Sequence, residues 1–290
     1  MTNNPQQIAF ALITYYPKWY RGNLRSISHT DKIRGDLAIE FVQKATRLKY
    51  HVVIVDGNSS KSFKRTLSAF TDISIIRRKG YKRAPSKRQA FKIAAKLPDI
   101  KVLIATEAEK ISLIDSVQQI AKPILENTSD IVVPKREETL FKATYPDYMY
   151  NSEIEGNRLY NQQMKLHHLL PENADNLDMF FGPRAFRNDK KILSLFMQTF
   201  SFKIANIHYS KEYFDPEELS NASFYPIVLA LQKKLRVQSV EIPFHYPKLQ
   251  KENENIGVRE QFVVKRNAQR LGLLIELMYF LNYIQTKRKN

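Results

Sequence analysis

Short apolar runs of strand length alternate with segments of helical spacing over the first 136 residues. The runs lie at 8–16, 51–56, 73–77, 101–106 and 130–136. Between them, apolar residues recur every third or fourth position, which is the period of an amphipathic helix. Strands joined by helical crossovers form a mainly parallel sheet that helices cover on both faces. The chain is therefore predicted to be α/β and Rossmann-like, with ligands beyond the carboxyl ends of the strands.

The second half of the chain is less regular but continues to show helical spacing. Over the whole chain the predicted helices are 36–49, 61–69, 86–97, 113–126, 151–168, 189–200, 216–234 and 259–284. One more strand is predicted at 236–242. Because no linker divides the chain, we expect one domain over residues 1–250 and a C-terminal helical extension at 251–290.

The amino-acid composition limits which compartment and which kinds of binding partner fit the protein. The chain has no cysteine, which excludes disulfides, thiolate metal sites and a cysteine nucleophile, and agrees with a reducing compartment. No secretory signal and no apolar run of about 18 residues is present, so we expect a cytoplasmic protein without a membrane span. The formal net charge of +17 favours anionic partners, such as nucleic acid, acidic lipid or a phosphorylated small molecule.

Polar side chains follow three of the predicted strands where each strand ends. Thr14 and Tyr16 close the first strand, Asp56 closes the second, and Glu107 and Glu109 follow the strand at 101–106. An aspartate here can accept hydrogen bonds from a base or ribose. Two carboxylates at positions i and i+2 of an extended turn can share one divalent cation. Each motif taken alone is more typical of an ordinary turn or solvated loop.

A basic segment at 79–91 lies between the last two of these strand ends. It carries five lysines or arginines, and Ser86 is a candidate N-cap for the helix that follows. Because helix N-termini attract phosphate oxygens, we expect this helix start to hold a diphosphate.

The order of these motifs resembles a known family. The stretches "VVIVDGNSS", "PSKRQAF" and "LIATEAEKISL" are similar to the three early motifs of nucleotide-sugar glycosyltransferases with the GT-A fold. The resemblance is greatest to the family 2-type and mannosylglycerate-synthase-like enzymes and covers residues 8–250. It implies a nucleotide-sugar half at 1–136, an acceptor half at 137–250, and transfer of a hexosyl group from a nucleotide-diphosphate sugar to an unidentified acceptor.

The resemblance also implies roles at the donor site. Asp56 matches the aspartate that contacts the nucleotide base, and Lys87 or Arg88 matches a basic residue that approaches the nucleotide. Thr14, Tyr16 and Glu107 are expected to complete the donor site, because they lie at the same strand ends.

A divalent cation, Mn²⁺ or Mg²⁺, is implied in the same way. The metal-binding Asp-x-Asp of the family falls on the Glu-x-Glu motif, with Glu109 as a ligand, and His245 matches a later histidine ligand. Both acids are glutamates, which departs from the family pattern. Lys110, and also Lys82 or Arg83, can replace a metal in part by pairing with phosphate.

The acceptor half contains a candidate catalytic base. An inverting transferase needs a carboxylate near the acceptor hydroxyl, and Asp178 precedes "FFGPRAF", which is similar to the family's acceptor segment. A turn or capping aspartate is the alternative, and a retaining mechanism requires no such base. Glu153, Asn157 and Tyr160 lie on adjoining turns of a helix and line either the acceptor pocket or an exposed polar face.

The C-terminal helix allows several partners. Residues 271–284 are apolar on more than one face and lie between Lys265, Arg266 and Arg270 on one side and the basic residues 287–289 on the other. The helix is expected to pack on the domain or on a second copy in a homodimer. The alternative is peripheral contact with an acidic membrane surface.

Three other functions compete with the transferase interpretation. A nucleic-acid-binding protein is less favoured, because the basic residues are spread widely and no zinc-finger, RRM or KH signature is present. A nucleotidyltransferase would need a glycine-rich phosphate loop near the N-terminus, whereas "YYPKWYRGN" contains one glycine. The glutamates in place of aspartates also allow an inactive GT-A homologue.

Overall fold

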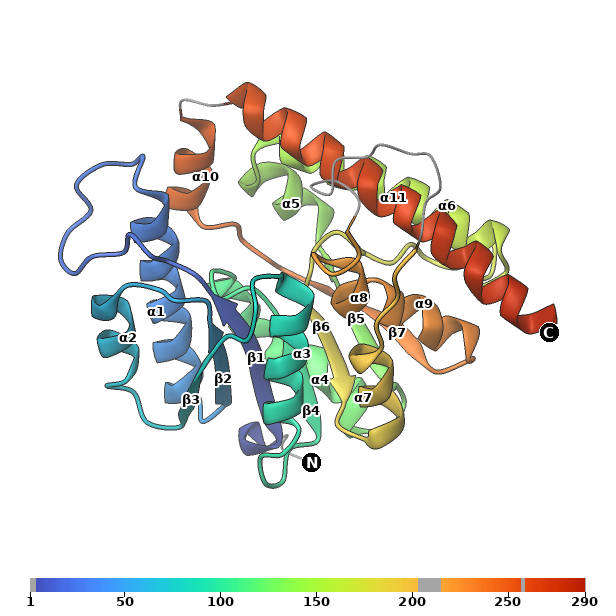
Figure 1. Ribbon diagram of the computed structural model, residues 1–290, viewed down its shortest axis with the longest axis horizontal. Helices are drawn as coiled ribbons and strands as arrows, with labels where there is room; N and C mark the ends of the chain where they lie inside the picture. The colour runs from blue at the N-terminus through green and yellow to red at the C-terminus, as the bar shows by residue number, and fades with distance from the viewer. Residues whose placement is uncertain (1–3, 203–214, 257–258, 290) are drawn as a thin grey trace.

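The computed structural model describes residues 4–202, 215–256 and 259–289. One seven-stranded sheet has the order β3-β2-β1-β4-β6-β5-β7 (Figure 1). Its strands are β1 (Ile8–Thr14), β2 (His51–Asp56), β3 (Ile73–Arg77), β4 (Val102–Ala105), β5 (Ile131–Arg136), β6 (Arg184–Arg187) and β7 (Val237–Ile242). Only the two pairings made by β6 are antiparallel, so the mainly parallel α/β sheet is confirmed.

The helices largely follow the predicted order. They are α1 (Thr30–Arg47), α2 (Lys61–Leu67), α3 (Arg83–Ala94), α4 (Val117–Leu125), α5 (Glu138–Thr144), α6 (Asp147–Leu166), α7 (Lys190–Met197), α8 (Ser220–Ser223), α9 (Tyr225–Gln232), α10 (Lys248–Asn255) and α11 (Arg259–Lys289). Short 3₁₀ turns lie at η1 (Pro5–Gln7) and η2 (Ile111–Ser116).

Two predictions about helix boundaries are wrong. The helix expected at 216–234 is interrupted at Phe224. A new helix, α9, begins at Tyr225 with Pro226 in its first turn, because proline lacks the amide that would continue α8. Ser86 does not cap α3, which begins three residues earlier at Arg83. The Ser86 Oγ donates instead to the carbonyl of Lys82, 2.8 Å away, inside the first turn.

The periodicity predicts no strand at β6. This strand is four residues long and has arginine at both ends, so it lacks the alternation that identifies strands in sequence. Its extended form comes from pairing with β4 on one side and β5 on the other. The antiparallel insertion brings the loop at 179–182 to the carboxyl end of β4.

Helices cover both faces of the sheet, and β1 shows why its run is continuously apolar. Ala9 and Ala11 pack into one core with α3 and α11, whereas Ile8, Phe10 and Leu12 pack into the other core with α1 and α4. Successive strand residues point to opposite faces, so a strand covered on both sides has no polar positions.

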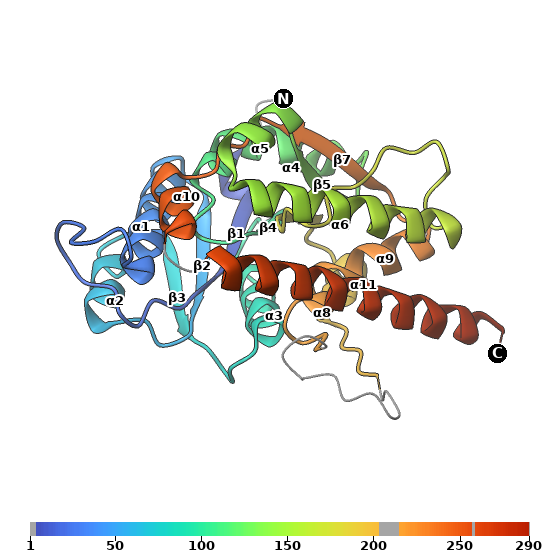
Figure 2. The same ribbon diagram turned by 90° about the horizontal axis from the view of Figure 1, so that it is seen from above.

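The long helix α11 packs on the domain. It runs beside α6 in both views (Figures 1 and 2), and Leu277, Phe280 and Leu281 on it are buried. The Phe280 ring stacks on Tyr225 with 4.0 Å between centroids. Packing on the domain, one of the arrangements expected from the sequence, is therefore present. The structure describes the backbone of residues 287–289 but not their basic side chains.

Among the described helices, none combines the length and the apolar composition that a membrane span requires.

Candidate functional site

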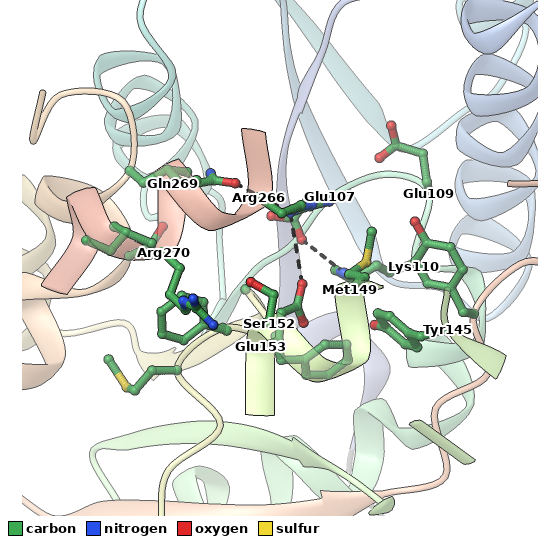
Figure 3. A pocket seen from close by; sticks show the side chains of 18 of the residues that line it. Glu107, Glu109, Lys110, Tyr145, Met149, Ser152, Glu153, Arg266, Gln269 and Arg270 are labelled. Atoms are coloured by element: carbon green, nitrogen blue, oxygen red, sulfur yellow. Dashed lines mark hydrogen bonds and ion pairs between the residues drawn. The ribbon is translucent and has the colours of Figure 1, made fainter. Parts of the chain in front are cut away.

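A cavity of about 180 Å³ opens beyond the carboxyl end of β4 (Figure 3). Its walls come from α3, the loop after β4, α6, the loop at 179–182 and α11, with single residues from α1, α8 and α10. These segments are far apart in the sequence but meet where parallel strands end, which is the general position of ligand sites in such sheets.

Glu107 lies between two lysines in this cavity. Its Oε2 is 3.7 Å from the Nζ of Lys110, and its Oε1 is 3.9 Å from the Nζ of Lys87 (Figure 3 shows the first pair). Burial alone would raise the pKa of Glu107, but Lys110 and Lys87 outweigh it, and the pKa is lowered. Glu107 is therefore held as a carboxylate between two ammonium groups.

Glu109 has a different cationic partner. The Nε of Arg34, from α1, lies 2.9 Å from its Oε1. Burial and the adjacent Glu109 raise the pKa of Tyr16, whose ring packs against Phe63. The second acid of the motif is thus neutralised by an arginine that no local pattern connects to it.

The predicted metal ligands do not fit a divalent cation in this arrangement. Glu107 and Glu109 each face basic side chains, which would repel an added cation. His245 is exposed, does not line the cavity, and forms only backbone hydrogen bonds with the Ser112 hydroxyl. Over 4–202, 215–256 and 259–289, no group of three histidine or acidic side chains is placed to hold a metal ion.

Asp56, the predicted base-contacting residue, closes the turn after β2. Its carboxylate accepts hydrogen bonds from the Thr14 Oγ1 at 2.9 Å and from the amides of Asn58 and Ser59 at 3.0 and 2.9 Å. The Ser59 hydroxyl in turn accepts from the Tyr16 amide at 2.9 Å. Thr14, Tyr16 and Asp56 are therefore brought together, but they lie beside the cavity rather than in its lining.

An exposed aromatic residue lies at the same strand ends and is not anticipated by the motif comparison. Tyr15 is more than half exposed, and the guanidinium of Arg78 lies 5.6 Å from its ring centre. Arg78 also packs against Gly57, where an added Cβ would lie 2.9 Å from its Cζ. The aromatic pair in "TYYP" was the available signal.

The basic segment of α3 divides between two environments. The Lys87 Nζ donates to the Ser223 hydroxyl at 3.0 Å and lines the cavity, and burial lowers its pKa. Arg88 points elsewhere and pairs with Glu217, with 2.7 Å between Nη2 and Oε2. Of the two predicted alternatives, Lys87 is the one in the cavity.

The start of α3 is poorly suited to hold a diphosphate through its backbone. The Ala84 amide already donates to the Glu217 carbonyl at 2.9 Å, and Pro85 has no amide hydrogen. The backbone at the helix start therefore does not fit the expected role of binding phosphate. The side chains of Arg83 and Lys87, from the same helix, line the cavity.

Asp178, the predicted catalytic base, is saturated by protein donors. The Arg136 Nη2 and Nε lie 2.8 Å from its two oxygens, the Arg136 amide lies 3.2 Å from Oδ2, and the Asn157 Nδ2 lies 2.7 Å from Oδ1. Burial would raise the pKa of Asp178, but Arg136 outweighs it and the pKa is lowered. Asp178 also does not line the cavity, so this geometry does not favour a base role.

From the half of the chain that was expected to bind the acceptor, Glu153 is the carboxylate that lines the cavity among the described residues. Its Oε2 accepts from the Arg136 Nη1 at 2.6 Å, while its Oε1 lies 4.0 Å from the Nη1 of Arg266 (Figure 3). Asn157 and Tyr160, on the next turns of α6, are buried and outside the lining. Of the three residues considered on this helix, only Glu153 reaches the cavity.

Helix α11 contributes to the site, which the sequence analysis missed. Arg266, Gln269 and Arg270 line the cavity, and the Arg270 Nε is buried without a hydrogen-bond partner among the described residues. The basic spacing on α11 was noted as a possible membrane contact, but no local pattern indicated that it faces the strand ends.

Neither a protein-family model nor a curated protein matches the sequence. The structure, however, is similar to glucosyl-3-phosphoglycerate synthase from Mycobacterium tuberculosis, solved with Mn²⁺, uridine diphosphate and phosphoglyceric acid. The TM-score is 0.53 at 9% identity, with 94% of this chain and 78% of that chain covered.

Two further solved structures are more distant. One is 4-diphosphocytidyl-2C-methyl-D-erythritol synthase from Anaerococcus prevotii, with a TM-score of 0.45, 11% identity, and 91% of this chain and 98% of that chain covered. The other is the 1–349 fragment of S. aureus TarS, with a TM-score of 0.43, 13% identity, and coverage of 91% and 70%.

The first similarity extends over nearly the whole chain, and identity at this level shows the fold alone. Together with the sheet order and the helical cover on both faces, it confirms the fold that the three early motifs predicted. The chain has a GT-A-like fold.

Proposed function

We propose that this protein is a glycosyltransferase that moves a sugar from a nucleotide-diphosphate sugar to an acceptor hydroxyl. One observation carries the proposal. Lys87 and Lys110, from two different elements, face one cavity beyond the carboxyl end of β4 in a GT-A fold. Ammonium groups placed there can bind the two phosphates and stabilise the charge that develops as they depart.

In this reaction the bond between the sugar C1 and the diphosphate oxygen breaks, and its electron pair remains on the phosphate. A new bond forms between C1 and the acceptor oxygen, whose proton passes to a base. Glu153 replaces Asp178 as the candidate base, because it is the acceptor-side carboxylate with an oxygen toward the cavity. A general base contributes about 10²- to 10⁴-fold to such a rate.

We assign the nucleobase of the donor to the ends of β1 and β2, which lie beside the cavity. Asp56 organises this turn, and the exposed ring of Tyr15 with Arg78 beside it offers a stacking surface next to the cavity. Aromatic rings stack on nucleobases with little dependence on base identity.

The proposal is tested by calorimetric titration with a panel of UDP-, GDP-, CDP-, ADP- and dTDP-sugars in the presence of Mn²⁺. We expect one nucleotide class to bind. Turnover with a panel of hydroxyl acceptors should then release the nucleoside diphosphate. Absence of binding across the panel would contradict the proposal. Release of pyrophosphate from a nucleoside triphosphate and a sugar phosphate would identify the nucleotidyltransferase alternative instead.

A further inference from the structure

Basic side chains of the protein pair with both carboxylates of the Glu-x-Glu motif, which does not favour the binding of a metal ion. Glu107 is flanked by Lys87 and Lys110, and Glu109 is paired with Arg34 at 2.9 Å. A divalent cation binds where carboxylate charge is in excess and oxygen ligands converge. Here each carboxylate charge is already offset by protein side chains.

The charge of the whole lining points the same way. Among the residues that the structure describes, six basic side chains and three carboxylates line the cavity, which gives a net charge of +3. The basic residues are Arg34, Arg83, Lys87, Lys110, Arg266 and Arg270. A nucleotide-sugar diphosphate carries negative charge, so this wall attracts it directly and needs no bridging cation.

Two features make Lys110 suitable as the fixed positive charge. It follows the acid motif directly on the loop after β4, and its ammonium lies 5.0 Å from the Phe181 ring centre, which restricts where it can move. Lys110 is therefore held in place before a ligand arrives.

We infer that this site binds the diphosphate of its nucleotide-sugar donor without a divalent cation, with Lys110 and Lys87 in the position that a metal would otherwise occupy. The inference rests on the proposed transferase function and specifies how its donor is held. In the transfer step the two ammonium groups receive the departing diphosphate, whose oxygen keeps the electron pair of the broken C1–O bond. Glu107 offsets part of the positive charge of the two lysines and makes no contact that the donor needs.

Calorimetry on EDTA-treated protein, with UDP, GDP, CDP, ADP and dTDP as probes, tests the inference. We expect one nucleoside diphosphate to bind, with an affinity that changes less than about twofold when Mn²⁺ or Mg²⁺ is added. A titration of Mn²⁺ alone, followed by electron paramagnetic resonance, should show no bound ion. Binding that occurs only with metal would overturn the inference and leave the transferase proposal standing. No binding with or without metal would contradict both.

Substitutions are expected to change nucleotide binding differently at a metal-free site and at a metal site. Lys110→Met should weaken metal-free binding by about 10-fold or more, the worth of one charge-assisted hydrogen bond. Lys110→Arg should restore part of it. Lys122→Met, on an exposed lysine of α4, is the matched control and should change nothing.

Glu107→Gln is the decisive variant. If Glu107 only offsets the two lysines, removal of its charge should strengthen metal-free binding by about fivefold, the worth of one partly exposed ion pair. If Glu107 is a metal ligand, the same change should weaken metal-supported binding instead. Thermal melting of each variant shows whether the fold is retained, and a Glu107→Gln protein that melts normally but binds more weakly would overturn the inference.

Discussion

Gly182 lies directly against the carboxylate of Glu107. A Cβ added at Gly182 would lie 3.0 Å from both oxygens of that carboxylate, and the Gly182 backbone has a φ of +100°. Both the close approach and the positive φ require glycine. The loop that follows Asp178 thus packs directly against the first acid of the motif.

Gly182→Ala should therefore affect both stability and binding. We expect a loss of about 1–2 kcal/mol in the free energy of unfolding, because alanine disfavours the left-handed backbone and its Cβ would crowd Glu107. Nucleotide binding should also weaken, because the displaced carboxylate moves toward the lysines. Gly80→Ala is the control, since Gly80 has a φ of +87° and open space around it. Equal effects of the two variants on binding would contradict this account.

Asp178 is expected to be structural rather than catalytic. Asp178→Asn removes one of the two carboxylates that pair with the fully buried Arg136 guanidinium, and breaking a buried pair in this way costs about 3–5 kcal/mol. Denaturant unfolding measures this loss. Asp175→Asn, on an exposed residue of the same loop, should stay within about 0.5 kcal/mol of the parent. An Asp178→Asn protein of normal stability but without turnover would restore Asp178 as the base.

Glu153 is expected to act on the acceptor. In Glu153→Gln, turnover measured as release of nucleoside diphosphate should fall by about 100-fold, while donor affinity stays within about threefold. Glu155→Gln provides the control, because Glu155 lies on the same helix and pairs with Arg158 at the surface. Unchanged turnover in Glu153→Gln would indicate a mechanism that needs no protein base, as in retaining transfer.

Glu276 should make stability depend on pH in an unusual direction. It is buried on α11, where it accepts hydrogen bonds from the Ser220 hydroxyl and from the Asp215 amide, and burial raises its pKa from 4.5 to about 7. Between these two values the unfolded chain ionises Glu276 and the folded protein does not. Stability from this group is therefore complete below pH 4.5 and falls by about 3 kcal/mol as the pH rises to 7.

Glu276→Gln tests this dependence because glutamine mimics the neutral acid. The free energy of unfolding of the parent, relative to that of the variant, should decrease as the pH is raised from 5 to 8. Parallel pH curves for the two proteins would show that the Glu276 pKa is not raised. The comparison isolates Glu276 from carboxylates such as Asp178, whose lowered pKa gives a stability change of opposite sign at more acidic pH.

Local patterns were sufficient for most of the fold. The run at 51–56 and the helical spacing after it depend on neighbours within a few residues, and the crossover rule then places strands in one parallel sheet. Strand β6 was not predicted, because its four residues, from Arg184 to Arg187, have no periodicity of their own. Its state is decided by the strands on both sides of it.

The sequence by itself determined that Asp56, Glu107 and Glu109 stand at strand ends, because parallel strands deliver the residues after them to one edge of a sheet. Only the tertiary structure decided which charges these residues meet. Arg34 comes from α1 and Lys87 from α3, and no spacing along the chain relates them to the acids. Charged groups interact through space over a few ångströms, whatever their separation along the chain. The Glu-x-Glu motif therefore resembles a metal site in the sequence, whereas in the folded protein its carboxylates form ion pairs with basic side chains.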